Sequence, residues 1–327
     1  MSFKRIFISM LSCMFLTVPY FAGCNQPETP QTEPPEDLTT PFTVTIFTDV
    51  HHADKDKSAE WNCSKATTKL QNILDNTKSS AFYISLGDAV DSLPANSTIF
   101  YDELISIYKQ NKLNIFNLKG ENYVQGNRMI YNLMGNHEAG HVAKSLLSEY
   151  IPYRENIGCA FTWKHKGILF VAIDACYDSK DMSDSIQSLV SGPKSFGIPQ
   201  AQFDFIKQEL DSKVDSNVKS IVWLSHIAYK DIEENTRVKL ANLMTGYNLP
   251  VTIFEGHTHI SNTYKVFDET VPTKTKLNVY TLPPVTNDFT KLYNSDDRNL
   301  SCPYYNVTFK NGLISKVDRI LNNRIPK

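Results

Sequence analysis

The segment NLMGNHEAGH, residues 132–141, directly follows the apolar run MIY at 129–131. A predicted buried strand therefore meets a glycine, and an amide, an imidazole and a carboxylic acid come next. Two interpretations are open. Gly135-Asn136 is an ordinary turn with a surface His137, or the segment places polar groups at the end of a strand for a chemical purpose. The rest of the chain distinguishes between them.

Four other strand-like segments end in the same way. Apolar, β-branched runs alternate with segments of helical periodicity, which predicts an α/β fold with a β-rich C-terminal part. In α/β sheets, ligands bind at the carboxyl ends of strands, so we expect these polar groups at one site. The groups are Asp49-Val50-His51, Gly87-Asp88, Gly135-Asn136-His137-Glu138, Ser225-His226 and Gly256-His257-Thr258-His259.

The individual elements follow from the same periodicities. Asn311-Gly312 is typical of a hairpin turn, and Pro199 is expected at the start of a helix. The helices are expected within 59–78, 99–110, 200–210 and 233–244. The strands are expected within 41–52, 81–91, 128–138, 159–175 (a hairpin), 220–229, 251–260, 305–309 and 313–317.

The strand ends hold five of the eight histidines of the chain: His51, His137, His226, His257 and His259. One turn motif cannot explain this placement. Imidazole nitrogens with carboxylate and amide oxygens, and without thiolates, suit Zn, Mn, Fe or Ni. The set is too large for one tetrahedral ion and fits two ions that share a carboxylate.

The order D-x-H, GD, GNHE, H and GHTH, from Asp49 to His259, resembles the signature of calcineurin-like metallophosphoesterases. The resemblance implies a four-layer α/β/β/α sandwich as a single catalytic domain, residues 42–327. It also implies two divalent metal ions, with Mn, Fe, Zn and Ni all open as candidates.

Carried over to this chain, the resemblance implies a role for each motif residue. His137 would be the general acid that protonates the leaving-group oxygen, with Asp91 orienting it, and a hydroxide held between the ions would be the nucleophile. The metal ligands would be Asp49, His51 and His259 for the first ion, Asn136, His226 and His257 for the second, and Asp88 shared between the two.

Departures from the pattern narrow the substrate class. Asp91 stands where purple acid phosphatases have an iron-binding tyrosine, and Ser92 stands where protein phosphatases have a phosphate-clamping arginine. We therefore expect a phosphate ester of a small molecule or lipid head group, with a phosphodiester favoured over a monoester. The alternatives are a non-catalytic ligand-binding lipoprotein on the same fold and a nuclease of the same superfamily. The net charge of −2 and pI of about 6.4 argue against a nucleic-acid partner.

The N-terminus predicts export. Lys4 and Arg5 precede an apolar stretch, residues 6–21, which is typical of a signal peptide over 1–23, with an uncleaved signal anchor as the alternative. Phe21-Ala22-Gly23-Cys24 resembles a bacterial lipobox, which implies acylation of Cys24. Residues 24–41 are rich in Pro, Glu and Thr and predict an extended linker. We expect a lipid anchor in a bacterial membrane, with the outer membrane favoured.

Several further residues have two interpretations each. Glu138 either hydrogen-bonds a ligand histidine or is an acid at the N-terminus of a helix. Glu255 either hydrogen-bonds a ligand histidine or points away from the site, as strand alternation allows. His52 either contacts substrate or lies at the rim, whereas His141 and His165 are expected at the surface. Two groups remain: aromatic residues that either flank a substrate or pack in the core (Tyr177, Tyr229 and Tyr247), and cysteines that could pair in an exported protein (Cys63, Cys159, Cys176 and Cys302).

Overall fold

Two β-sheets organise the protein. In the computed structural model the described residues form two sheets of six strands each. The described residues are 37–53, 66–91, 98–118, 128–183, 195–260, 262–266, 277–285 and 302–321. The predicted signal peptide, Cys24, Cys63, Ser92 and most of the predicted linker lie outside these ranges.

The first sheet has the strand order β12-β11-β1-β2-β4-β3. Its strands β1, β2, β4 and β3 are parallel, and β11 pairs antiparallel with both β1 and β12. The predicted hairpin turn joins β11 to β12 with left-handed φ angles of 56° at Asn311 and 72° at Gly312. The strands span Phe42–Phe47 (β1), Phe82–Ser85 (β2), Leu113–Ile115 (β3), Arg128–Asn132 (β4), Tyr304–Lys310 (β11) and Leu313–Ile320 (β12).

The second sheet has the strand order β5-β6-β7-β8-β10-β9. Its strands β6, β7, β8 and β10 are parallel, and β5 and β9 pair antiparallel at the edges. Every residue of β6, β7 and β8 is buried, as expected for parallel strands covered on both faces. The strands span Phe161–His165 (β5), Ile168–Ile173 (β6), Ser220–Ser225 (β7), Val251–Glu255 (β8), Asn262–Val266 (β9) and Leu277–Thr281 (β10).

The sheets pack against each other through an apolar layer supplied by both. Phe82 of β2 meets Phe170 of β6 edge to face, with ring centroids 5.6 Å apart. Tyr131 of β4 stacks on Trp163 of β5 at 4.0 Å. Aromatic pairs of this kind add to the burial that holds two sheets face to face.

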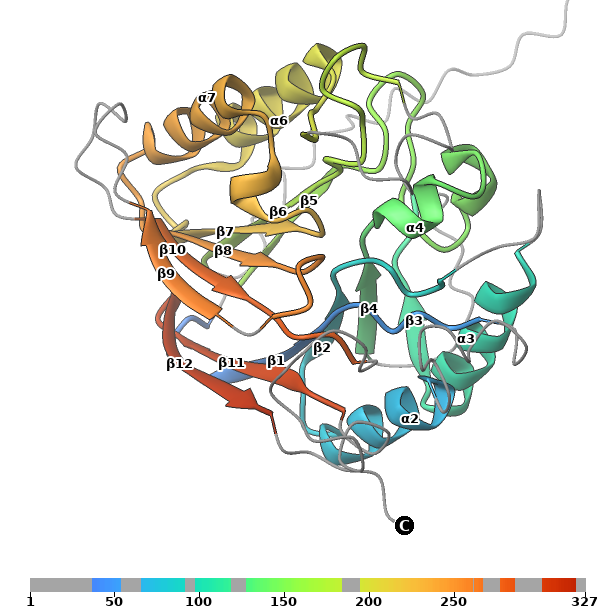
Figure 1. Ribbon diagram of the computed structural model, residues 1–327. Helices are drawn as coiled ribbons and strands as arrows, with labels where there is room; N and C mark the ends of the chain where they lie inside the picture. Colours follow the sequence, from blue (N-terminus) through green and yellow to red (C-terminus); the bar gives the residue numbers. More distant parts are fainter. Residues whose placement is uncertain are drawn as a thin grey trace, which may run out of the picture. The chain divides into compact units, whose positions relative to one another are not determined.

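Helices cover the outer faces of the sheets (Figure 1). The helices α2 (Ala66–Asn76) and α3 (Ile99–Gln110) flank the first sheet, and α6 (Gln200–Lys213) and α7 (Glu234–Thr245) flank the second. Their apolar sides are buried, including Leu70 of α2, Leu104 of α3, Ile206 of α6 and Leu240 of α7. The predicted α/β/β/α sandwich, a single domain, is confirmed.

Most predicted elements are confirmed, but several bounds are corrected. The strands expected over 41–52, 81–91, 220–229 and 251–260 end at Phe47, Ser85, Ser225 and Glu255, where the polar loops begin. Of the helix expected over 59–78, residues 59–65 lie outside the described residues, and β9 and β10 lie in the part that was expected to be β-rich without individual bounds. The strand expected over 128–138 ends at Asn132, because the GNHE segment begins the short helix α4 (Asn136–Ala139). The three-residue strand β3 was not expected, since Leu113–Ile115 is too short to show a period.

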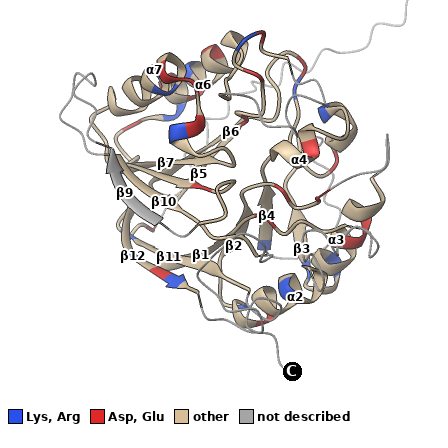
Figure 2. Cartoon of the chain, viewed as in Figure 1, with Lys and Arg blue, Asp and Glu red and all other residues tan. Residues whose placement is uncertain are grey.

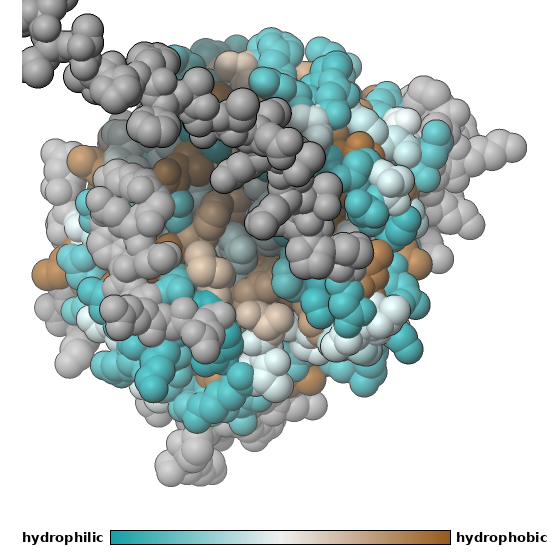
Figure 3. All heavy atoms as spheres, turned by 180° about the vertical axis from the view of Figure 1, so that it is seen from behind, coloured by the Kyte–Doolittle hydropathy of each residue, from teal (hydrophilic) through white to brown (hydrophobic). Residues whose placement is uncertain are grey.

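Charged side chains lie mainly along the helices and the rims of the sheets (Figure 2). Hydrophilic residues also dominate the described periphery of the face seen from behind (Figure 3). Within the described residues, no helix is long and apolar enough to cross a membrane. The described cysteines Cys159, Cys176 and Cys302 are all buried, and they form no disulfide with one another.

Candidate metal centre

The loops that follow β1, β2, β4, β7 and β8 meet at the carboxyl ends of these strands, as the sequence predicts. The first two loops run side by side, because the Asp49 N–H donates to Gly87 O at 3.0 Å and the His51 N–H donates to Asp88 O at 2.9 Å. The first sheet contributes Asp49, His51, Asp88 and Asn136, and the loops after β7 and β8 contribute the three other predicted ligands.

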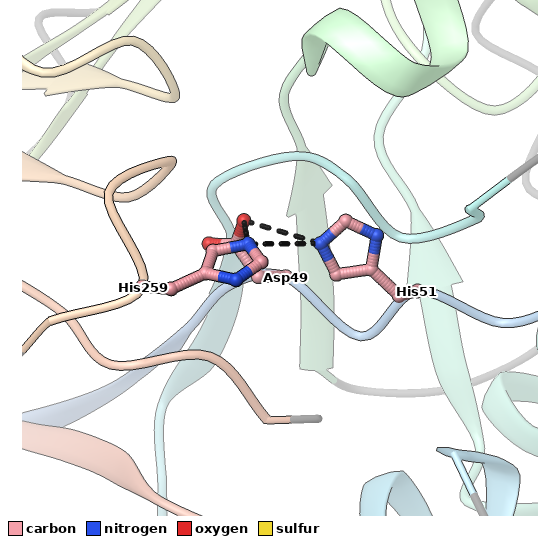
Figure 4. A group of neighbouring side chains, drawn as sticks. All are labelled: Asp49, His51 and His259. Atoms are coloured by element: carbon pink, nitrogen blue, oxygen red, sulfur yellow. Dashed lines mark hydrogen bonds and ion pairs between the residues drawn. The ribbon is translucent and has the colours of Figure 1, made fainter. Parts of the chain in front are cut away.

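The first group of side chains is Asp49, His51 and His259, which converge from opposite sides (Figure 4). His259 Nε2 lies 3.1 Å from Asp49 Oδ1, and His51 Nε2 lies 3.5 Å from the same oxygen. The two histidine Nε2 atoms are 3.1 Å apart. Three donor atoms that converge in this way could bind one ion.

The second group is Asp88, His226 and His257, joined by Asn136. His226 Nε2 lies 3.1 Å from both Asp88 Oδ2 and Asn136 Oδ1. His257 Nδ1 lies 2.9 Å from Asn136 Oδ1. The predicted second set of ligands therefore also converges.

Asp88 lies between the two groups. Its Oδ2 atom is 3.8 Å from His51 Nε2 and 3.1 Å from His226 Nε2. His137 Nε2 is 3.9 Å from the same oxygen, so His51, Asp88 and His137 could also hold an ion. The structure thus places His137 beside the shared carboxylate, and its role as acid instead of ligand stays a prediction.

The ligand backbone adopts an unusual conformation. Asp49, His51, Asp88, His257 and His259 all have left-handed φ angles, between 47° and 66°. This region is uncommon for non-glycine residues, and such strain concentrates at functional sites. Five of the seven predicted ligands therefore carry a backbone signal that the sequence pattern does not show.

Two glycines permit the close approach of these loops. A Cβ atom on Gly135 would lie 2.1 Å from Asp88 Oδ1, and one on Gly256 would lie 2.3 Å from Thr48 Oγ1. Thr48 in turn donates to Asp49 Oδ2 at 2.6 Å. Gly135 therefore lets the loop after β4 approach the Asp88 loop, and Gly256 brings the second sheet against the first.

Glu138 is the acid in the first turn of α4, as one interpretation of the sequence predicts, and its carboxylate also meets the loop after β2. Its carboxylate accepts four backbone N–H groups, from Asp88 (3.0 Å), Ala89 (2.6 Å), Val90 (3.1 Å) and Gly135 (2.8 Å). Three of these hydrogen bonds come from the loop that carries Asp88 and the fourth from the N-cap of α4, and none comes from a ligand histidine. The GNHE spacing signals an acid here, but only the fold shows which amides it meets.

Asp91 contacts two histidines with the same oxygen. Asp91 Oδ1 lies 3.3 Å from His137 Nδ1 and 3.2 Å from His51 Nδ1. His137 Nδ1 is also 2.7 Å from the Asp91 carbonyl oxygen. The first contact was predicted from the family resemblance, whereas no sequence pattern indicated the second contact, to His51.

The carboxylates and histidines of the site shift one another's pKa values. Burial opposes ionisation of Asp49, yet His259 and His226 hold its pKa well below the ordinary value. Burial would lower the pKa of His226, yet Asp88 and Asp49 raise it to about 9. Burial and the nearby His226 lower the pKa of His257 to about 4. Without a cation, these pKa shifts favour a protonated His226 beside the buried carboxylates and a neutral His257.

The donor set fits divalent metal ions. All the donors are imidazole, carboxylate or amide groups, which suit first-row divalent ions. The facing nitrogens of His51 and His259 repel each other unless a proton or a cation lies between them. A cation would replace such protons.

The other candidates lie outside this group. His52 contacts the Glu103 carboxylate and the edge of Phe100. His165 packs against the rings of Phe42 and Phe82. His141 lies in the turn after α4 and belongs to none of the metal-competent groups of the described residues.

Structural contacts account for Glu255 and for the three candidate tyrosines. The Glu255 carboxylate accepts the Tyr229 N–H at 2.7 Å and so holds the loop after β7. Tyr177 and Tyr229 are buried, and the Tyr247 hydroxyl donates to Asp211 of α6. These contacts favour core packing over substrate binding for the tyrosines.

Comparison with known proteins is informative at the level of family and fold. Residues 42–261 match the sequence profile described as calcineurin-like phosphoesterase. No curated protein sequence matches the chain significantly. The purple acid phosphatase PPD1 of yellow lupin (Lupinus luteus) is similar in structure, with a TM-score of 0.50 and 14% identity over 87% of this chain. That match covers 54% of the lupin chain, so this chain spans about half of the plant enzyme.

A bacterial structure also matches. The protein TT1561 of Thermus thermophilus has a TM-score of 0.45 and 9% identity, over 86% of this chain and 100% of the bacterial chain.

Proposed function

We propose that the chain, which belongs to the calcineurin-like phosphoesterase family, is a metal-dependent phosphoric ester hydrolase whose substrate is a phosphodiester of a small molecule or lipid head group. The observation that carries the proposal is the convergence of two donor groups on either side of Asp88, with His137 beside it. A site with two such groups can bind both the attacking and the leaving oxygen of an in-line displacement.

Two divalent ions are proposed for this site. Asp49, His51 and His259 would hold one, and Asn136, His226 and His257 the other, with Asp88 shared. When bound, the ions supply positive charge that attracts the phosphate and acidifies a water molecule. The neutral amide of Asn136 supports the proposal, because it provides an oxygen ligand without reducing that charge.

His137 is proposed as the general acid. Its Nδ1 atom meets the Asp91 carbonyl oxygen at 2.7 Å, which favours a proton on Nδ1 and fixes the ring. The Nε2 atom then faces the shared carboxylate side of the site. An imidazolium in this position can donate its Nε2 proton to the leaving oxygen.

The proposed size and class of the substrate rest on the net charge of the chain and on the residue that follows Asp91. A net charge of −2 gives the chain no basic field that would attract a nucleic acid. Ser92 at the position of the protein-phosphatase arginine favours small esters over phosphoproteins. Both observations support a small phosphate ester, and the assay below decides between a diester and a monoester.

The test compares bis-p-nitrophenyl phosphate with p-nitrophenyl phosphate, using the full chain loaded with Mn²⁺ in detergent. We expect the diester to be cleaved faster, with activity lost on chelation and regained on adding Mn²⁺. A faster monoester reaction would indicate a phosphatase. Cleavage of neither ester with Mn²⁺, Fe²⁺, Zn²⁺ or Ni²⁺ would contradict the proposal and favour the binding lipoprotein, and cleavage of single-stranded DNA would favour the nuclease.

We also propose that the mature chain is anchored through acylated Cys24, by way of the Pro-, Glu- and Thr-rich linker. The basic, apolar and lipobox-like order of the N-terminal residues supports this. Cys24→Ala should move the protein from the membrane to the soluble fraction. An unchanged membrane fraction would favour the signal anchor instead.

A further inference from the structure

Lys144 is a buried lysine outside the candidate metal centre. It begins the short 3₁₀ helix η1 (Lys144–Leu147), which follows α4 in the segment after β4. Its side chain is 1% exposed, and lysine is almost never this buried without a partner. The segment after β4 also carries Asn136 and His137, so Lys144 belongs to the half of the site built on the first sheet.

The ammonium group of Lys144 has three partners, one for each proton. Nζ donates to Asp174 Oδ2 at 2.8 Å and to the Cys176 carbonyl oxygen at 2.9 Å. It also lies 3.3 Å from the centroid of the Tyr177 ring, a cation–π contact. All three partners come from the loop that follows β6 of the second sheet.

Asp174, directly after β6, is held from several directions. Its carboxylate accepts the N–H groups of Cys159 at 3.1 Å and Cys176 at 3.0 Å. Gln202 of α6 bonds both its backbone N–H and its carbonyl oxygen. The carboxylate is therefore a fixed point of the second sheet, and Lys144 joins the first-sheet segment to it.

The loop after β6, which Lys144 binds, contacts the segments that carry two ligands of the proposed second ion. Cys176 Sγ lies 3.6 Å from the Met134 carbonyl oxygen, two residues before Asn136. The Gly197 N–H donates to the Tyr177 carbonyl oxygen at 2.9 Å. The neighbouring Phe196 packs its ring against His257, with centroids 5.3 Å apart and planes at 84°.

We propose that the Lys144–Asp174 ion pair is a positioning device that sets the separation between Asn136 on the first sheet and His257 on the second. The proposal rests on the proposed function, since it concerns ligands of the second ion. A buried ion pair is a weak source of stability, because its desolvation offsets its attraction. Its three-fold coordination instead fixes one geometry across the two sheets.

The first donor group, Asp49, His51 and His259, depends less on the Lys144–Asp174 ion pair. Asp49 and His51 lie on one loop after β1, and His259 meets Asp49 directly at 3.1 Å. Gly256 and Thr48 bring these loops together independently of Lys144. The proposal therefore predicts an effect on the second ion and little effect on the first.

The test removes both charges together, since Lys144→Met alone would leave Asp174 buried and unpaired. In the full chain carrying Lys144→Met and Asp174→Asn, Mn²⁺ binding is measured by titration calorimetry, and the spin coupling of the bound ions by electron paramagnetic resonance. We expect the second dissociation constant to rise about 10- to 100-fold, as for other residues that orient ligands. The first constant should change less than about threefold, and the exchange-coupled signal of the ion pair should weaken.

The matched control is the exposed ion pair of Lys164 and Asp215, 2.9 Å apart in the wild type, replaced by the same residue types. Both Mn²⁺ dissociation constants of this control variant should stay within about twofold of the wild-type values, because exposed ion pairs contribute little. If the double variant does not melt cooperatively, Asp174→Glu, which keeps the charge and lengthens the side chain, is measured instead with the same expectation.

Two outcomes would overturn the inference while the proposed function stands. One is two Mn²⁺ ions bound with wild-type constants and an unchanged coupled signal. The other is an equal loss of affinity at both sites together with a lower melting temperature, which indicates general destabilisation. A wild-type chain that binds fewer than two ions would refute the proposed function itself.

Discussion

Replacing Glu138 by glutamine tests the backbone contacts that hold the Asp88 loop. Each carboxylate oxygen accepts two N–H groups: Oε1 those of Ala89 and Val90, and Oε2 those of Asp88 and Gly135. Glutamine replaces one oxygen by an amide NH₂, which cannot accept. Whichever way the amide turns, two N–H donors lose their acceptor.

The magnitude follows from the burial of those donors. Glu138, Asp88 and Val90 are at most 1% exposed, so water cannot replace the lost oxygen. An unsatisfied buried donor costs about 1–3 kcal/mol, so two cost about 2–6 kcal/mol. That is a large part of a typical unfolding free energy of about 5–15 kcal/mol.

The assay is urea unfolding of the metal-free full chain, followed by circular dichroism, with Mn²⁺ affinity measured in parallel. Glu209→Gln is the control, because Glu209 is a partly exposed partner of Lys213 on α6 and should contribute at most about 1 kcal/mol. A Glu138→Gln variant that unfolds within about 1 kcal/mol of the wild type and binds Mn²⁺ normally would refute the assigned role of Glu138.

Three other perturbations give distinct results. His137→Ala should lower kcat about 10²- to 10⁴-fold with two Mn²⁺ ions still bound, and loss of one ion in metal analysis would make His137 a ligand. Gly135→Ala should abolish Mn²⁺ uptake, because its Cβ would lie 2.1 Å from Asp88 Oδ1, and normal uptake would contradict the tight loop contact. The pKa of His226, raised from 6.5 to about 9 in the metal-free fold, adds stability below pH 6.5 that is lost as pH rises through 9. Mn²⁺ must displace that proton, so its affinity should rise with pH over this interval, and calorimetry in buffers of different ionisation enthalpy that shows no proton release would contradict this.

The sequence predicts the layers of the fold because periodicity and turn residues are local signals. The helix 99–110 and the Asn311-Gly312 hairpin need only neighbouring residues to be recognised, and both are confirmed. The helix α4 stayed only an alternative, because its four residues are too few to show a helical period and GNHE looked like the end of a strand.

The strand-end positions of the candidate site were also predictable, because parallel strands bring their carboxyl ends to one edge. What the sequence could not provide are contacts between residues far apart in the chain. The three amides of the Asp88 loop bound by Glu138 and the second contact of Asp91 depend on how loops of the first sheet pack, and the Lys144–Asp174 pair depends on how loops of the two sheets pack. None of these residues stands in a pattern that names its partner.

The most direct test of the central claim is anomalous diffraction at the Mn edge from crystals of the Mn²⁺-loaded chain. We predict two peaks on either side of Asp88, one among Asp49, His51 and His259 and the other among Asn136, His226 and His257. A single peak, or one bound through His137, would contradict the dinuclear site proposed here.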